Sequence, residues 1–131
     1  MSVKSVKEDL KNKAPDLEII EHNISTASVD EAALAHNVKP GQIVKTIALM
    51  LDQPILLMVA GDTKIDNKKY KKKFKKKAKM LSGEQTEEFT SHPIGGVCPF
   101  GLPSKLNVYA DASLDNYDFV IPAAGSVNSS V

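Results

Sequence analysis

The spacing of hydrophobic residues along the chain predicts four helices. In the first, apolar residues recur every three or four positions until a proline ends the pattern. The second and the fourth begin with a capping box, a serine followed three residues later by glutamate or glutamine. In the third, which is rich in lysine, apolar residues stand at positions i, i+4 and i+8 and leave a narrow face for packing. These helices are expected at about residues 3–15, 29–37, 67–79 and 82–89.

Runs of β-branched and other apolar residues predict strands between these helices. Ile43–Leu51 and Ile55–Ala60 are separated by the turn Asp52-Gln53-Pro54, so they are expected to form a hairpin near the middle of the fold. The segment Ser91–Ser104 holds three prolines and three glycines and is expected to be a loop. Shorter strands are expected at residues 17–21, 107–110 and 119–122. Helices and strands interleave irregularly, which predicts a mixed α+β domain.

Length and composition indicate one globular domain. The 131 residues, of which 42% are hydrophobic, are enough to bury a core and are expected to form a single domain over 1–131. The apolar runs are too short to cross a bilayer, and the N-terminus lacks the apolar core of a signal peptide, so no membrane partner is expected. Cys98 is the single cysteine, which excludes an internal disulfide and favours a reducing, cytoplasmic location.

Positive charge is concentrated in one segment. The net charge is +1, yet residues 64–79 hold ten lysines and one acid, while the other 115 residues hold seven lysines and fifteen acids. Such a patch binds phosphate backbones through point charges and counterion release, without reading their sequence. A solvated helix face is an equally good interpretation of the same lysines.

A lysine interrupts the first strand of the predicted hairpin. Because side chains alternate along a strand, Lys45 shares a face with Ile43, Ile47 and Leu49. That apolar face is expected to pack against the hydrophobic core. Burying an ammonium group there costs free energy unless an anion meets it, so Lys45 is a candidate anion-binding residue. The alternative is an edge strand on which the lysine extends its charge to water.

The glycine- and proline-rich loop is the second candidate for chemistry. Adjacent Gly95 and Gly96 let the backbone approach a ligand closely and direct N–H groups at an oxygen, and the flanking prolines hold that shape. The pattern is neither a Walker phosphate loop nor a dinucleotide fingerprint. A tight surface connection is the alternative interpretation.

Nucleophilic and metal chemistry receive little support. Cys98 would need a base in order to act as a nucleophile, and no triad can be named from His22, His36 and His92. A small buried side chain is the favoured interpretation of Cys98. One cysteine and three scattered histidines show no metal-ligand spacing, so neither a metal nor another cofactor is expected.

Six motifs follow the order found in a known family. Each is weak alone, but together they run along nearly the whole chain. On these motifs the sequence resembles the YbaK/ProX family of aminoacyl-tRNA deacylases, which is similar to the editing domain of bacterial prolyl-tRNA synthetases. The motifs are Ser25–Ser28 with the alanine-rich helix after it, Pro40–Thr46, Val59–Asp62, Gly95–Gly101, Asp111–Leu114 and Ala124–Ser126.

The resemblance implies a compact domain whose twisted, partly barrel-like mixed sheet carries flanking helices, with a pocket for the aminoacylated 3′ end of tRNA. In that pocket Lys45 would hold the terminal phosphate or ribose, and the backbone of Gly95, Gly96 and Val97 would bind the ester carbonyl and its developing oxyanion. Substrate-binding positions are implied at Thr46, Cys98, Pro99, Gly125 and Ser126. Contacts to the tRNA backbone are expected from Lys68, Lys69, Lys72, Lys73 and Lys76.

The activity that the resemblance implies is trans-editing, the hydrolysis by water of a small amino acid of the alanine, cysteine or serine class from mischarged tRNA. The expected carrier is tRNA-Pro, and an aminoacyl-tRNA synthetase is a further partner that the resemblance allows. The alternatives are a non-catalytic module that binds tRNA ends, nucleotides or a synthetase, and a nonspecific nucleic-acid binder that uses residues 64–79. Relatives often have serine where Cys98 stands and continue beyond Gly125-Ser126, which leaves open a truncated chain with an incomplete pocket wall.

Overall fold

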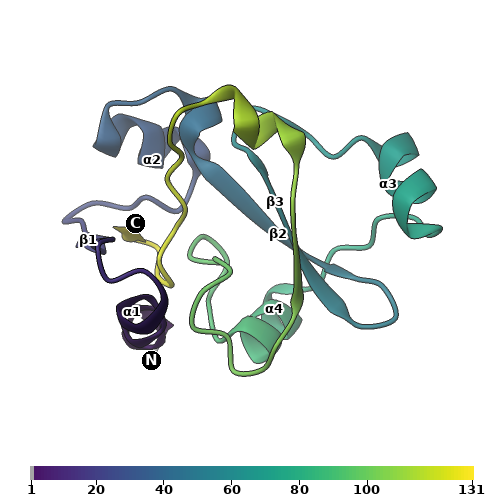
Figure 1. Cartoon of the computed structure of the whole chain (residues 1–131), viewed down its shortest axis with the longest axis horizontal. Coiled ribbons are helices and arrows are strands. Elements are labelled where there is room, and N and C mark those ends of the chain that lie inside the picture. Colours follow the sequence, from purple (N-terminus) through teal and green to yellow (C-terminus); the bar gives the residue numbers. More distant parts are fainter. Residues whose placement is uncertain (1) are drawn as a thin grey trace.

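The structure is a computed structural model that describes residues 2–131. Its centre is a three-stranded sheet in the order β2-β3-β4 (Figure 1). β2 (Val44–Met50) and β3 (Pro54–Ala60) form the predicted hairpin, in whose antiparallel register Lys45 pairs with Val59. β4 (Asn107–Ala110) runs parallel to β3 on its other side. β2 is therefore an edge strand of this sheet.

A second, two-stranded sheet joins segments from the two ends of the chain. β1 (Ile20–Glu21) pairs antiparallel with β5 (Ser129–Ser130), so the strand predicted at residues 17–21 is reduced to its last two residues. The strand predicted at residues 119–122 is wrong, because Ile121 forms a single parallel bridge with Ile43 and the following proline has no N–H to continue a ladder. Two serines have little strand propensity, and long-range pairing decides the position of β5.

The helices are those that the sequence predicts, with one difference in length. Both capping boxes form: the hydroxyl of Ser28 accepts a hydrogen bond from the Glu31 N–H, and that of Ser82 from the Gln85 N–H, each at 3.1 Å. No helix among residues 2–131 is long and apolar enough to cross a membrane. The helices are α1 Ser2–Lys13, α2 Val29–His36, α3 Asn67–Phe74 and α4 Gly83–Thr90, and the short 3-10 helices are η1 Pro40–Gln42 and η2 Ala112–Asn116.

The lysine-rich helix α3 is shorter than its sequence pattern predicts. It ends at Phe74, and Lys75 takes the left-handed conformation with φ of 64°, so the predicted extension to Lys79 is wrong. Lysines four residues apart repel each other along a helix, which weakens its continuation. The chain then extends alongside β2, where the Met50 N–H donates to the Lys79 carbonyl at 2.9 Å. This pairing replaces the last helical turn.

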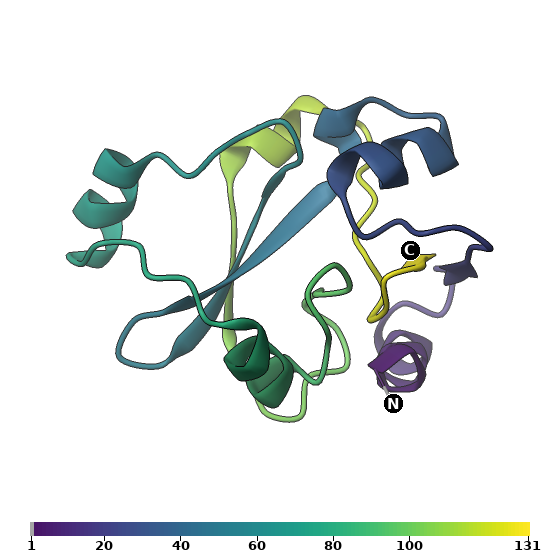
Figure 2. The same ribbon diagram turned by 180° about the vertical axis from the view of Figure 1, so that it is seen from behind.

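Two hydrophobic clusters lie on opposite faces of the sheet. Figures 1 and 2 show the ribbon of this sheet from opposite sides of the molecule. On one face, Ala48, Leu56 and Leu81 pack with side chains from α4 and from the glycine-rich loop, among them Val97. On the other face, the cluster is built around Leu49, Ile55 and Tyr70, with Ile47 and Phe74 packed against it. The domain is thus an α+β fold as predicted, with an open sheet and not a closed barrel.

Helix α1 packs against the base of the glycine-rich loop. Val6 and Leu10 bury themselves against Cys98 and Ala124, where the loop and the C-terminal segment meet. The carboxylate of Asp9 also accepts a hydrogen bond from the backbone N–H of Gly101 at 2.8 Å, and this bond lowers the pKa of Asp9. One helix therefore fixes the base of the loop by apolar packing and by a charge-assisted hydrogen bond.

Candidate functional site

A pocket of about 660 Å³ lies along the edge of β2 that faces away from β3. Its wall includes Lys45 and Thr46 from β2 and Gly95 and Val97 from the glycine-rich loop, four of the residues that the sequence singles out. Other parts of the wall come from the segment before α2, from the segment around Ile121 and from the residues on either side of α3. The fold thus brings together two motifs that are fifty residues apart in the chain.

Lys45 is half-buried at this edge. Its exposure lies between the buried, anion-binding lysine and the solvent-exposed edge lysine that the sequence allowed. Its ammonium group donates a hydrogen bond to the backbone carbonyl of Thr63 at 2.7 Å. No carboxylate forms an ion pair with it among residues 2–131. An ammonium group has three donors, so Lys45 can still receive an anion from the pocket.

The backbone of the glycine-rich loop uses some of its hydrogen-bonding groups within the fold and leaves others, at residues that line the pocket, without a partner. The Gly96 N–H donates to the Pro93 carbonyl at 2.9 Å, and the Gly96 carbonyl accepts from the Gly125 N–H at 2.9 Å. Gly95 has a φ of 92°, which favours glycine. The N–H groups of Gly95 and Val97 have no acceptor within the described chain. These two N–H groups, rather than that of Gly96, are available to an oxyanion.

Cys98 and Pro99 do not line this pocket, although the family resemblance implied substrate-binding positions for both. Cys98 is fully buried beside α1, with its sulfur 3.6 Å from His92 Nε2, and burial raises the pKa of its thiol to about 12. Pro99 lines a separate groove next to α1. His92 is buried as well, with Nε2 2.7 Å from the Phe100 carbonyl, and burial lowers its pKa. The pair stabilises the loop from inside the core.

We expect the thiol of Cys98 to be unreactive in the folded protein. A thiol that is fully buried and has a pKa of about 12 holds almost no thiolate at neutral pH. Titration with a chromogenic disulfide reagent at pH 8 should show no reaction on the timescale of minutes, and one equivalent should react in urea. Rapid reaction of the folded protein would contradict this position for Cys98.

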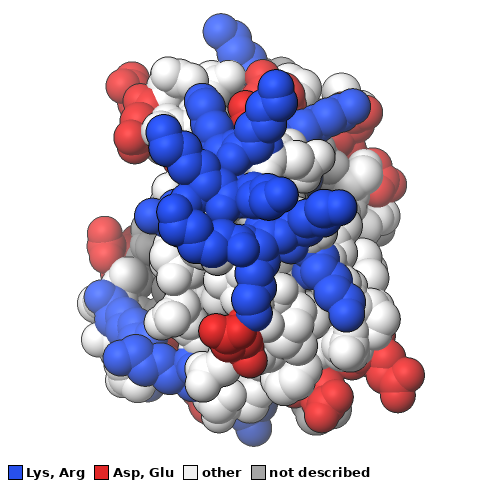
Figure 3. All heavy atoms as spheres, turned by 90° about the vertical axis from the view of Figure 1, so that its right-hand side faces the viewer, with Lys and Arg blue, Asp and Glu red and all other residues white. Residues whose placement is uncertain are grey.

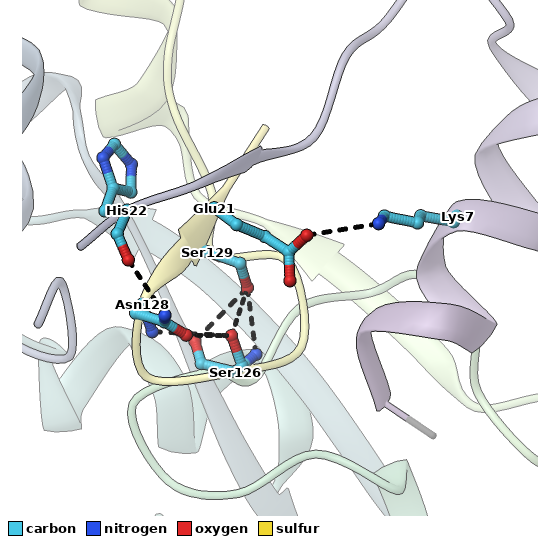
Figure 4. A network of polar contacts seen from close by, with 6 residues as sticks. All are labelled: Lys7, Glu21, His22, Ser126, Asn128 and Ser129. Carbon is cyan, nitrogen blue, oxygen red and sulfur yellow. Dashed lines mark hydrogen bonds and ion pairs between the residues drawn. The ribbon is translucent and has the colours of Figure 1, made fainter. Parts of the chain in front are cut away.

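Gly125 and Ser126 lie behind the glycine-rich loop and do not line the pocket. Figure 4 shows the polar network that holds this segment. The Ser126 hydroxyl is 2.7 Å from Ser129 Oγ and 2.9 Å from Asn128 Oδ1, and the Asn128 side chain donates to the His22 carbonyl at 3.0 Å. The Gly125-Ser126 motif thus connects the loop to β5 and β1.

The lysines around α3 form one positive surface. Figure 3 shows the side of the molecule that carries it. Lys68, Lys69 and Lys72 are exposed, and Lys76 pairs with Asp52. Lys73 lies over the rings of Phe74 and Tyr109, at 5.8 and 5.7 Å from their centroids. The surface reaches the pocket at Lys64, which lines it together with Asn67, the first residue of α3. Sequence reasoning found the lysines but not their contact with the pocket.

Two threonines of the pocket wall, Thr26 and Thr46, have buried hydroxyl groups. No role for Thr26 was predicted from the sequence, and the resemblance implied for Thr46 only a substrate-binding position. Thr26 is 5% exposed, and its hydroxyl has no hydrogen-bond partner in the part of the chain that the structure describes; the same holds for the buried hydroxyl of Thr46. Buried hydroxyl groups without protein partners are uncommon, and at the wall of a pocket water or a ligand is expected to bond with them. Residues 2–131 contain no cluster of three or more His, Cys, Asp or Glu that could hold a metal ion.

Comparison with known proteins identifies the family. The sequence model of the aminoacyl-tRNA editing domain matches residues 23–131. The chain belongs to the aminoacyl-tRNA editing domain family. The predicted resemblance is thereby confirmed, whereas the predicted domain boundary at residue 1 stays a prediction, because α1 lies outside the matched segment.

Relatives in sequence and in structure agree with this family. The chain is 43% identical over its whole length to YwhH of Bacillus subtilis (strain 168), an uncharacterised protein of which it covers 85%. It is also 27% identical over 104 residues to the proline–tRNA ligase of Citrifermentans bemidjiense, of which it spans 18%. A crystal structure of a protein proposed to be a trans-editing enzyme for prolyl-tRNA synthetase superposes with a TM-score of 0.91 and 29% identity, covering 98% of this chain and 83% of that one.

Proposed function

We propose that this editing domain acts in trans and hydrolyses the ester between a small amino acid and tRNA, with tRNA-Pro as the carrier. The observation that carries the proposal is the shared pocket of Lys45, Thr46, Gly95 and Val97 in a chain of this family. The relation to proline–tRNA ligases supports tRNA-Pro. The proposed class of amino acid, alanine, cysteine or serine, comes from the resemblance to the YbaK/ProX family.

The proposed reaction needs no protein nucleophile. Water attacks the ester carbonyl carbon, a C–O bond forms, and the bond to the ribose oxygen breaks as that oxygen takes up a proton from the water. The N–H groups of Gly95 and Val97 stabilise the oxyanion, and the Lys45 ammonium fixes the terminal phosphate or ribose. An aminoacyl ester is already activated, so positioning and oxyanion stabilisation are enough to accelerate its hydrolysis.

A panel of mischarged tRNAs tests this function. tRNA-Pro charged with labelled alanine, cysteine, serine or proline is incubated with the protein, and release of the amino acid is followed against the uncatalysed rate. We expect release of at least one of the three small amino acids and retention of proline. Tight binding of uncharged tRNA without release of any amino acid would overturn the proposal in favour of a non-catalytic binding module.

The lysine surface is proposed to hold the tRNA backbone outside the pocket. Exchanging Lys68 and Lys72 together for glutamine should raise KM several-fold, leave kcat unchanged and reduce the salt dependence of log KM by about one unit per lysine that contacts a phosphate. The matched control is the exchange of the exposed Lys4 and Lys11 on α1. Equal effects of the two double variants would contradict a specific role of α3.

A further inference from the structure

The two predicted halves of the site lie on opposite faces of β2. Lys45 follows the face of Ile47 and Leu49, which packs toward α3, whereas the glycine-rich loop packs through Val97 against the face of Ala48. Side chains alternate across a strand, so no single face of β2 carries both halves. A ligand that contacts Lys45 and the loop must therefore cross the edge of the strand between them.

That edge is paired at both ends and open in the middle. Near its start, the Val44 N–H donates to the Ile121 carbonyl at 2.9 Å, and near its end the Leu81 N–H donates to the Ala48 carbonyl at 3.0 Å. These bonds show that Val44 and Ala48 direct their backbone groups away from β3. Strand alternation directs those of Thr46 the same way.

The backbone N–H and carbonyl of Thr46 therefore point into the gap. Outside the β2–β3 ladder, no hydrogen bond engages either group among residues 2–131, and Thr46 lines the pocket. The gap from Val44 to Ala48 measures about 13 Å along the strand, which leaves room for one residue between the two flanking segments. The buried hydroxyls of Thr26 and Thr46, also without partners, lie in the same wall.

We infer that Thr46 binds the aminoacyl group of the substrate through its main chain, as one rung of a β-ladder. The α-ammonium donates to the Thr46 carbonyl. The ester carbonyl oxygen accepts from the Thr46 N–H in the bound ester, and the N–H groups of Gly95 and Val97 add to this bond as the oxyanion develops on the same atom. An amino acid ester presents this donor and acceptor with the spacing of a strand residue. The inference rests on the proposed function and adds to it a substrate-positioning role for the main chain of Thr46, which binds the α-ammonium and the carbonyl of the ester together.

The same geometry excludes peptidyl-tRNA. Its α-nitrogen is a neutral amide that carries the rest of the peptide, and the flanking segments at Ile121 and Leu81 occupy the positions into which that chain would continue. The flanking segments, together with the charge-assisted hydrogen bond that only an α-ammonium can donate to the Thr46 carbonyl, therefore favour free aminoacyl groups, and size selection is left to the side-chain part of the pocket.

The substrate experiment uses the aminoacyl-tRNA that the wild-type protein hydrolyses fastest and its N-acetyl derivative. Each rate is divided by the hydroxide-catalysed rate of the same ester, since acetylation also changes the reactivity of the ester itself. We expect the normalised rate to fall at least about tenfold on acetylation, as for loss of a charge-assisted hydrogen bond. Equal normalised rates would overturn the inference and leave the proposed function intact. Absence of hydrolysis of every small aminoacyl-tRNA would overturn both.

The protein experiment compares Thr46→Pro with Thr46→Val. Proline removes the N–H and is tolerated on an edge strand where that group faces away from the sheet, whereas valine removes the hydroxyl and keeps the N–H. We expect kcat/KM of Thr46→Pro to lie at least about tenfold below that of Thr46→Val, with equal affinity for uncharged tRNA. Equal values for the two variants would overturn the main-chain role. Circular dichroism verifies that both fold, and the acetylation experiment decides the inference if the proline variant does not.

Discussion

Replacing Lys45 by methionine is expected to lower kcat/KM for a mischarged tRNA by about 10- to 150-fold, the equivalent of one hydrogen bond to a charged group. Methionine keeps the length and the apolar stem of the side chain but removes the ammonium group. That group is half-buried, donates to the Thr63 carbonyl, and has no carboxylate partner among residues 2–131, so its remaining donors are free for the phosphate or ribose of the tRNA end.

The measurement is single-turnover deacylation, accompanied by a urea unfolding curve for each variant. The control is Lys105→Met, an exposed lysine outside this pocket, which should retain wild-type activity. Stability of the Lys45 variant should stay within about 0.5 kcal/mol of wild type, because its one hydrogen bond is to a half-exposed carbonyl. Full activity of Lys45→Met would remove this residue from the proposed site.

Gly96→Ala is expected to destabilise the fold by about 1–3 kcal/mol and to reduce activity at least tenfold. A Cβ at this position would lie 2.5 Å from the Ser126 nitrogen and 2.8 Å from the Gly125 carbonyl carbon. Both are backbone atoms of the segment that holds the loop against β5, so relief requires the loop to move. Such a movement displaces the neighbouring N–H groups of Gly95 and Val97.

Gly83→Ala is the matched control for this prediction. There the added Cβ would meet the tip of the Ile94 side chain at 3.2 Å, and the residue is the first of α4, where alanine is favoured. Its stability should rise or stay within about 0.5 kcal/mol of wild type. Urea unfolding with a common probe separates the two cases. Equal stabilities of the two variants would show that the loop does not depend on close approach at Gly96.

Local patterns were sufficient for most elements of the fold. The two capping boxes, the hairpin and the amphipathic α1 depend on interactions within a few residues, so their sequence signals carry over directly into structure. The failures are the end of α3, the strand expected at residues 119–122 and the serine pair in β5. All three concern segments that hydrogen-bond to residues distant in sequence. The propensity of a short segment does not depend on partners distant in the chain, so it cannot predict such pairing. Where the two conflict, long-range hydrogen bonds outweigh local propensity.

The candidate site divides in the same way. The sequence by itself marked Lys45 as a charge on an apolar strand and the paired glycines as a backbone that approaches something closely, because both features conflict with their local surroundings. The family resemblance placed the two in one pocket, and the residues themselves favoured a buried Cys98. The tertiary structure alone decided that the two motifs meet across an open strand edge and that Gly125-Ser126 supports the loop from the side away from the pocket. The physical reason is that burial, edge pairing and close backbone contact are made between segments far apart in the chain.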